Sequence, residues 1–189
     1  MSTHLASAPY VEPWLRGTYG DVPAVARALL HAFDLAADDL TKWTEGLTDV
    51  EIHTLPVELP PVAFHLRHIA RSVDRLLTYA EGGQLSAEQL TKLKAEEVGP
   101  QHDERETLAT LLDEVKASFG NASGRVRALA SADMNTFRGV GRKQLPTSVG
   151  GALVHVADHT MRHVGQVVTT AKVLKALRVK EPIAAVSET

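Results

Sequence analysis

Two histidines four residues apart, His159 and His163, are the residues of this sequence best placed to do chemistry. Residues with this spacing lie one turn apart on one face of a helix, with Cβ atoms roughly 5 to 6 Å apart. Both rings can therefore bind one divalent metal at about 2.0 to 2.1 Å. An isolated pair of this kind is more often two hydrogen-bonded or solvated rings. Here apolar residues flank the pair, and because buried imidazoles need polar partners, we expect a shared metal.

Three further histidines leave the ligand set open. His155 extends the same ladder backwards, so spacing alone also allows His155 and His159 as the chelating pair. His65 and His68 lie in an earlier helical segment, and either can supply a third nitrogen if the two helices pack together. Three histidines from two helices leave coordination positions free, which is typical of catalytic rather than structural sites. The expected metal is zinc, nickel or iron, and the sequence does not choose among them.

Charged residues near these histidines have two interpretations. Arg67, Arg71 and Arg75 repeat every four residues, and Arg162 lies inside the histidine motif. They could meet an anionic substrate group near the metal, but such a stripe is more often a solvated or salt-bridged face. Asp158 could orient a ligand ring, although a solvated helix residue is the simpler interpretation.

Composition favours one helical domain. The 189 residues are 44% hydrophobic and only 5% aromatic, and alanine, leucine and valine dominate, which suits helices packed on helices. The formal charge of −3, from 20 basic and 23 acidic residues, provides no basic field for a phosphate backbone. We therefore expect no nucleic-acid partner.

Cysteine and targeting signals are both missing from the sequence. Without cysteine the chain has no thiolate nucleophile or ligand, so any reactive thiol must arrive with a substrate. The amino terminus shows no secretory pattern, and no run of 18 apolar residues occurs. We expect a cytoplasmic protein with no membrane partner.

Helical periodicity predicts a four-helix bundle with long connections, an all-α fold. Prolines, glycines and capping residues place the ends of the helices. The predicted helices span about residues 21–46, 61–79, 103–129 and 147–177, with Thr147 or Ser148 as the cap of the last and a break allowed near Gly120.

The connections complete the predicted organisation. Residues 86–97 resemble a short helix, which we interpret as a surface crossover. Strand signals are absent, because no tight hairpin turn separates two alternating runs. We expect an amino-terminal arm over residues 1–20, a bundle domain over 21–178 and a carboxyl-terminal tail over 179–189.

Two motifs resemble those of the DinB/YfiT-like superfamily of metal-binding four-helix bundles. They are Phe64-His65-Leu66-Arg67-His68-Ile69-Ala70, and His159-Thr-Met-Arg-His163-Val-Gly165-Gln166. The similarity covers roughly residues 22–177. It departs from the family pattern at Val164, where arginine is common, and at Arg162, where a second histidine is frequent.

The resemblance implies a specific site and a class of chemistry. It selects His68, His159 and His163 as the metal ligands and gives no ligand role to His65 or His155. It implies a frequently dimeric protein, here a homodimer, and members that act as transferases or isomerases using small-molecule thiols.

Two functions therefore compete. The first is a metal-dependent enzyme that activates a thiol or water on a small-molecule substrate, of the thiol-dependent transferase or hydrolase type. The alternative is a non-catalytic helical bundle that binds a metal or small ligand for stress-related storage or sensing. A plain helical interaction domain ranks behind both.

Overall fold

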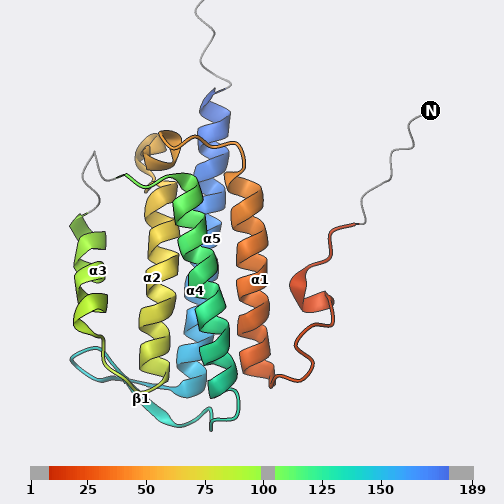
Figure 1. The fold of residues 1–189 in the computed structure, drawn as a ribbon, viewed down its shortest axis with the longest axis vertical. Coiled ribbons are helices and arrows are strands. Elements are labelled where there is room, and N and C mark those ends of the chain that lie inside the picture. Colours follow the sequence, from red (N-terminus) through yellow and green to blue (C-terminus); the bar gives the residue numbers. More distant parts are fainter. Residues whose placement is uncertain (1–8, 99–104, 179–189) are drawn as a thin grey trace, which may run out of the picture.

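Four long helices and one short helix dominate the part of the chain that the structure describes. The computed structural model describes residues 9–98 and 105–178 (Figure 1). The long helices are α1 (Ala24–Thr44), α2 (Val62–Ala80), α4 (Leu108–Leu129) and α5 (Val149–Arg178), and the short one is α3 (Ala87–Val98). The prediction of an all-α bundle with long connections is confirmed.

The order of the helices in space determines which residues can meet. Helix α5 packs against α1 and α2, and α4 packs against the same two helices. The chain ascends in α1, descends in α2 and α4, and ascends in α5 (Figure 1). Helices α2 and α5 are therefore antiparallel neighbours, and the middle of one faces the middle of the other. The connection from α2 to α4 has to return along the bundle, and it carries α3.

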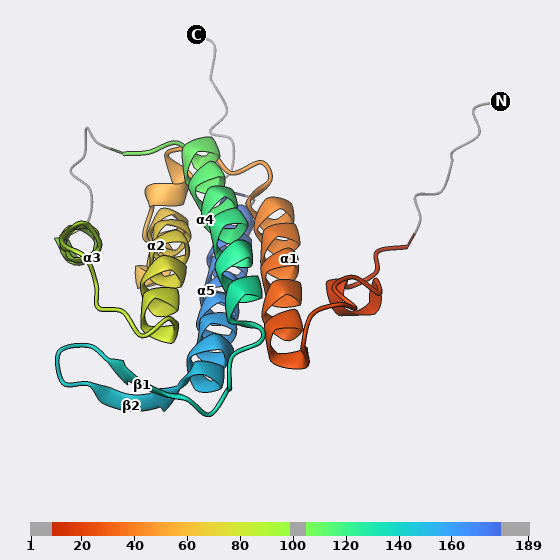
Figure 2. The same ribbon diagram turned by 60° about the horizontal axis from the view of Figure 1, so that its bottom comes forward.

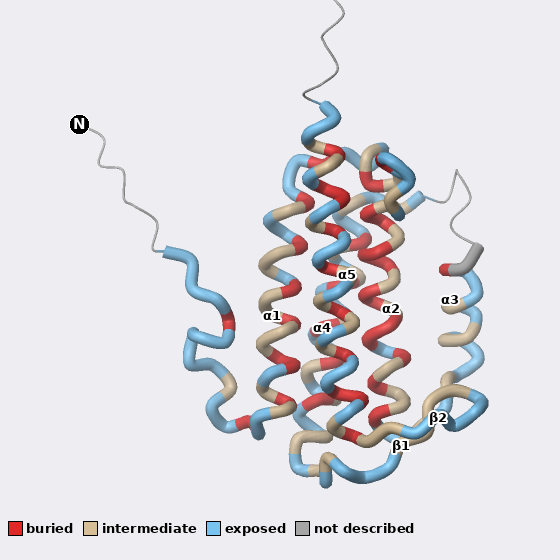
Figure 3. The backbone as a smooth tube through the Cα atoms, turned by 180° about the vertical axis from the view of Figure 1, so that it is seen from behind, coloured by how far each residue is buried: buried red, intermediate tan, exposed pale blue. Residues whose placement is uncertain are grey.

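The core lies where the apolar stripes of the four long helices meet. Leu29, Leu66, Leu111 and Leu153, one from each helix, are at most 1% exposed. Burial of such a side chain contributes about 1.5 to 3 kcal/mol. The buried segments of these helices face inward, whereas α3 is mostly exposed along its length (Figure 3). The core thus explains the long helices but not the position of α3.

Capping residues explain several helix ends. Helix α2 begins directly after Pro60-Pro61, as predicted. At α5, the Ser148 hydroxyl accepts a hydrogen bond from the Gly151 amide at 3.1 Å. Helix α4 begins at Leu108, later than predicted, because Thr107 caps it by accepting from the Thr110 amide at 3.1 Å. The predicted start at 103 or 104 lies outside the described residues. Helix α4 is continuous to Leu129, without a break at Gly120.

The prediction that the chain lacks strands is wrong. Strands β1 (Phe137–Val140) and β2 (Leu145–Ser148) form an antiparallel hairpin at the end of the bundle (Figure 2). Each strand has only four residues, and the turn uses Gly141 and Gln144 at positive φ rather than an Asn-Gly or Asp-Gly pair. The Arg138 guanidinium donates from Nε to the Ala80 carbonyl at 2.6 Å, which attaches the hairpin to the end of α2.

The amino-terminal segment lies beside α1. Its 3₁₀ turn, Pro13–Leu15, leaves Trp14 61% exposed, whereas Tyr19 donates a hydrogen bond to Asp34 on α1. The predicted tail, residues 179–189, lies outside the described residues, and the arm, bundle and tail boundaries stay predictions. Among the described helices, none has the length and apolar character that crossing a membrane requires.

Candidate metal centre

Three histidine rings from two helices converge between α2 and α5. Helix α2 supplies His68, and α5 supplies His159 and His163; one ligand nitrogen of each lies within 4.8 Å of the others. The Nε2 atoms of His68 and His159 are 3.0 Å apart. The His163 ring stands edge-on to both, with centroids 4.5 Å from His68 and 4.7 Å from His159. Each ring is half-buried.

This spacing suits a single metal ion. In a tetrahedral site with bonds of about 2.0 to 2.1 Å, ligand nitrogens lie about 3.3 Å apart. The closest pair here is 3.0 Å apart, and no ligand atom is more than 4.8 Å from another. Small ring rotations would therefore bring all three nitrogens onto one ion. Three nitrogens leave at least one position for water or a substrate atom.

Burial keeps two of these rings neutral. Burial, together with the nearby charges of His68, His155 and Arg162, lowers the pKa of His159 to about 4. Burial likewise lowers the pKa of His163 to about 3, assisted by His68 and His159. Both rings are therefore uncharged at neutral pH, and a metal requires the lone pair of a neutral imidazole.

The other nitrogen of His68 binds a buried carboxylate. His68 Nδ1 donates to Glu96 Oε2 at 2.8 Å, and Arg75 donates to both Glu96 oxygens, at 2.7 and 3.0 Å. Burial opposes ionisation of Glu96, but the hydrogen bonds from His68 and Arg75 outweigh it and hold its pKa below the usual value. With its proton fixed on Nδ1, His68 presents the lone pair of Nε2 to the metal position.

Sequence reasoning missed Glu96. It lies in α3, within the segment that we interpreted as a surface crossover, yet it is only 7% exposed. Its partner His68 is 28 residues earlier in the chain, so no local spacing indicates the contact.

His65 contacts His163, one of the three candidate ligands. Its Nδ1 lies 3.1 Å from Nδ1 of His163, and its side chain is 1% exposed. Burial, followed by repulsion from His68, lowers its pKa to about 4. If His163 donates a hydrogen bond from its Nδ1 to Nδ1 of His65, Nε2 of His163 is free to bind a metal. The proton of His65 is then on its buried Nε2, which has no hydrogen-bond partner among the described residues. His65 is thus placed to orient His163 rather than to bind the metal.

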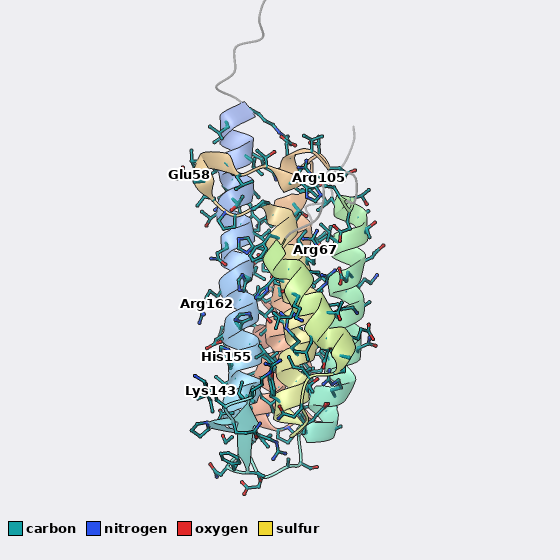
Figure 4. The ribbon with its side chains drawn as sticks, turned by 90° about the vertical axis from the view of Figure 1, so that its left-hand side faces the viewer. Glu58, Arg67, Arg105, Lys143, His155 and Arg162 are labelled. Carbon is teal, nitrogen blue, oxygen red and sulfur yellow. The ribbon has the colours of Figure 1, made fainter. Side chains whose placement is uncertain are left out.

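His155 lies outside the group. Its Nδ1 pairs with Asp158 at 2.9 Å, and both side chains are about half exposed. Asp158 therefore orients the ring of His155 and not that of a candidate ligand. His155 and Arg162 both lie along α5 (Figure 4). Arg162 is exposed, and its charge contributes to the low pKa values of His159 and His163.

The arginine stripe on α2 is a salt-bridged face. Each of its three arginines pairs with a glutamate from a later segment, which favours the structural interpretation over an anion site at the metal. The pairs are Arg67 with Glu106, Arg71 with Glu114 and Arg75 with Glu96. Of the three glutamates, Glu96 alone also contacts a candidate ligand.

A comparison with protein families agrees with this geometry. The model of the DinB superfamily matches residues 32–167, which include α2, α5 and all three histidines. The chain belongs to the DinB superfamily. This DinB protein matches no curated protein.

A solved structure supports the fold of this DinB protein. The fold of this chain is similar to the crystal structure of a protein described as the conserved protein of locus from Enterococcus faecalis, with a TM-score of 0.55 and 15% sequence identity. The match covers 80% of this chain and 98% of that one. At this identity the similarity concerns the arrangement of the helices only.

Proposed function

We propose that this DinB protein is a metal-dependent enzyme that activates a thiol or water for reaction with a small molecule. His68, His159 and His163 hold the divalent metal, which is zinc, nickel or iron. The observation that carries the proposal is the convergence of three imidazoles, with ligand atoms within 4.8 Å of one another. A divalent metal bound there lowers the pKa of a thiol or water in its open position.

The donor set supports this choice. His159 and His163 are neutral at neutral pH, and His68 is oriented by Glu96, so little reorganisation is needed before a metal binds. Because the chain has no cysteine, the thiol of a thiol-dependent transferase reaction comes from a small-molecule co-substrate. With water in its place, the same site supports hydrolysis.

Metal analysis of two histidine variants tests the ligand assignment. We expect about one divalent metal per chain in the wild-type protein and a large loss in His159→Ala. His155→Ala is the matched control, because His155 is on the same helix one turn away and pairs with Asp158 instead. Full metal occupancy in His159→Ala would refute the assignment.

A non-catalytic metal-binding protein, for stress-related storage or sensing, is the second candidate. It is favoured by the state of Glu96, the carboxylate that the described residues place against a candidate ligand: Glu96 is already engaged by His68 and Arg75 and is not a free general base. Zinc or nickel with a panel of small thiols separates the two functions. Metal-dependent stabilisation without consumption of any thiol or ester supports the storage protein, and consumption that His159→Ala abolishes supports the enzyme.

A homodimer is part of the same proposal. It rests on the resemblance of the motifs to the DinB/YfiT-like superfamily, and the partner of either function is otherwise a small molecule. Sedimentation of the full chain at several concentrations measures the oligomeric state, and a concentration-independent monomer would refute the dimer.

A further inference from the structure

A cavity of about 460 Å³ lies at the amino-terminal end of α2, and Phe64, one helical turn before His68, lines it. We call it the Phe64 cavity; its apolar wall consists of Leu55, Pro60, Pro61, Ala63 and Phe64. Its volume is in the range of about 300 to 1,000 Å³ that is typical of small-molecule pockets. A mostly apolar wall with a few charged groups is also typical of such pockets. No local pattern in the sequence predicts this cavity.

One aromatic ring separates the cavity from the metal centre. The Phe64 ring lies nearly parallel to the His68 ring, with centroids 5.7 Å apart and 12° between the planes. It also meets the His65 ring edge-on, at 5.2 Å. A molecule that packs on Phe64 in the cavity is therefore one ring away from a candidate metal ligand.

The charged groups of the cavity favour one negative charge on the ligand. Arg67 lines the cavity although it is only 5% exposed, and it uses Nε and Nη2 to bind Glu106. Among the described residues, no acceptor bonds its Nη1, so this donor is available to a ligand. Glu106 offsets the charge of Arg67, but Arg105 adds a cation that forms no ion pair between described residues, whereas Glu58 disfavours a second negative charge on the ligand. Figure 4 shows Glu58, Arg67 and Arg105 around this end of α2.

The backbone of the cavity wall is strained. Val57 and Glu58 are consecutive residues at φ of 45° and 64°, in the turn between Pro56 and Pro60. This left-handed conformation is uncommon outside glycine and is an outlier for β-branched valine. Such strain persists where the surrounding structure enforces it, and it concentrates at ligand sites. The strained turn thus indicates a ligand site independently of the charges.

We propose that the Phe64 cavity binds a small carboxylate with an apolar body, packed on Phe64 and paired with Arg67 and Arg105. We further assign it as the substrate pocket of the metal centre. This assignment rests on the proposed function, whereas binding of the acid does not require the metal.

Titration of the metal-free full chain with benzoate and with benzamide tests the inference. The two probes have similar shapes and differ in charge. We expect saturable benzoate binding in the millimolar range and binding of benzamide weaker by about fivefold or more. Ring resonances of His68 should shift with benzoate, because Phe64 stacks on that ring. Absence of benzoate binding, equal binding of benzamide, or an unmoved His68 signal each overturns the proposal.

Two variants localise the binding. Leu55→Asp places a negative charge at the rim, and Arg105→Gln removes a cation; each should weaken benzoate binding about fivefold or more. Val50→Asp is the matched control, since Val50 is exposed in the same connection but does not line the cavity. Equal binding by Leu55→Asp and Val50→Asp overturns the location. Because the titration uses metal-free protein, failure to bind benzoate would leave the metal assignment intact. Conversely, if the natively purified protein proved to contain no metal, the proposed binding of benzoate would still stand.

Discussion

The substitution Glu96→Gln tests whether the buried carboxylate prepares His68 for the metal. It keeps the shape of the side chain but removes the charge that His68 Nδ1 and Arg75 bind. Loss of such a carboxylate partner of a histidine ligand weakens metal binding about 10- to 100-fold. This corresponds to about 1.4 to 2.7 kcal/mol.

The same substitution also affects folding. Arg75 is 7% exposed, and removal of one partner of a buried ion pair costs up to about 3 to 5 kcal/mol. The glutamine can still accept a hydrogen bond from Arg75, so we expect a smaller loss. Metal affinity must therefore be compared among folded variants only, after their helical content and unfolding curves have been measured.

Competition with a chromophoric chelator measures the metal affinity. Glu114→Gln is the matched control, because Glu114 pairs with Arg71 one turn before Arg75 on α2. Glu114 binds no candidate ligand in any hydrogen bond between described residues. We expect Glu114→Gln to bind zinc or nickel like the wild type and Glu96→Gln to bind at least about tenfold more weakly. A folded Glu96→Gln protein with unchanged metal affinity would refute the reasoning.

Three further predictions follow from the site and the strained turn. The metal-free protein should lose stability as pH falls from about 6.5 towards 3, because the buried rings of His65, His159 and His163 have pKa values of about 4, 4 and 3 and the unfolded chain binds protons first. Urea unfolding at several pH values measures the free energy of unfolding, and His163→Asn should reduce its dependence on pH. An unchanged pH dependence in this variant contradicts the prediction. A metal at about one hundred times its dissociation constant should stabilise the wild type by about 2.7 kcal/mol, reversibly with chelator. A similar shift in His159→Ala would count against the ligand set. Val57→Gly should stabilise the chain by about 0.5 to 1 kcal/mol, since relief of about 1 to 2 kcal/mol of left-handed strain exceeds the entropic cost of glycine and little burial is lost at a side chain 71% exposed. Val50→Gly is the control, because Val50 has a φ of −71° and no left-handed strain to relieve, so this substitution should destabilise the chain. If both variants change the free energy of unfolding in the same direction, the strain at Val57 is refuted.

Local patterns predicted what depends on local physics. Apolar periodicity and the proline and glycine positions gave four long helices, because each helix must bury one stripe and stop at defined residues. The sequence offers Thr147 or Ser148 as the cap of the last helix, and Ser148 is the residue that caps it. The hairpin was missed because strands of four residues and a turn through Gly141 and Gln144 carry no periodic signal.

The surroundings of the candidate site depend on contacts far apart in sequence. Spacing could not rank His155 against His163 or His65 against His68, since both choices obey the same helical geometry. Packing separates them: the rings of His68, His159 and His163 meet, His65 lies behind His163, and His155 faces Asp158. The buried Glu96 and the Phe64 cavity were equally beyond the reach of local patterns.

The attachment of α3 has a consequence for the proposed metal centre. Glu96 is the only buried side chain among Ala87–Glu96, and it is bonded to His68. A ligand that fixes His68 therefore also strengthens the anchorage of this outer helix, and by thermodynamic reciprocity a well-anchored helix raises the affinity for the ion. Amide exchange along α3 should consequently slow when the centre is filled, so that the crossover reports on occupancy.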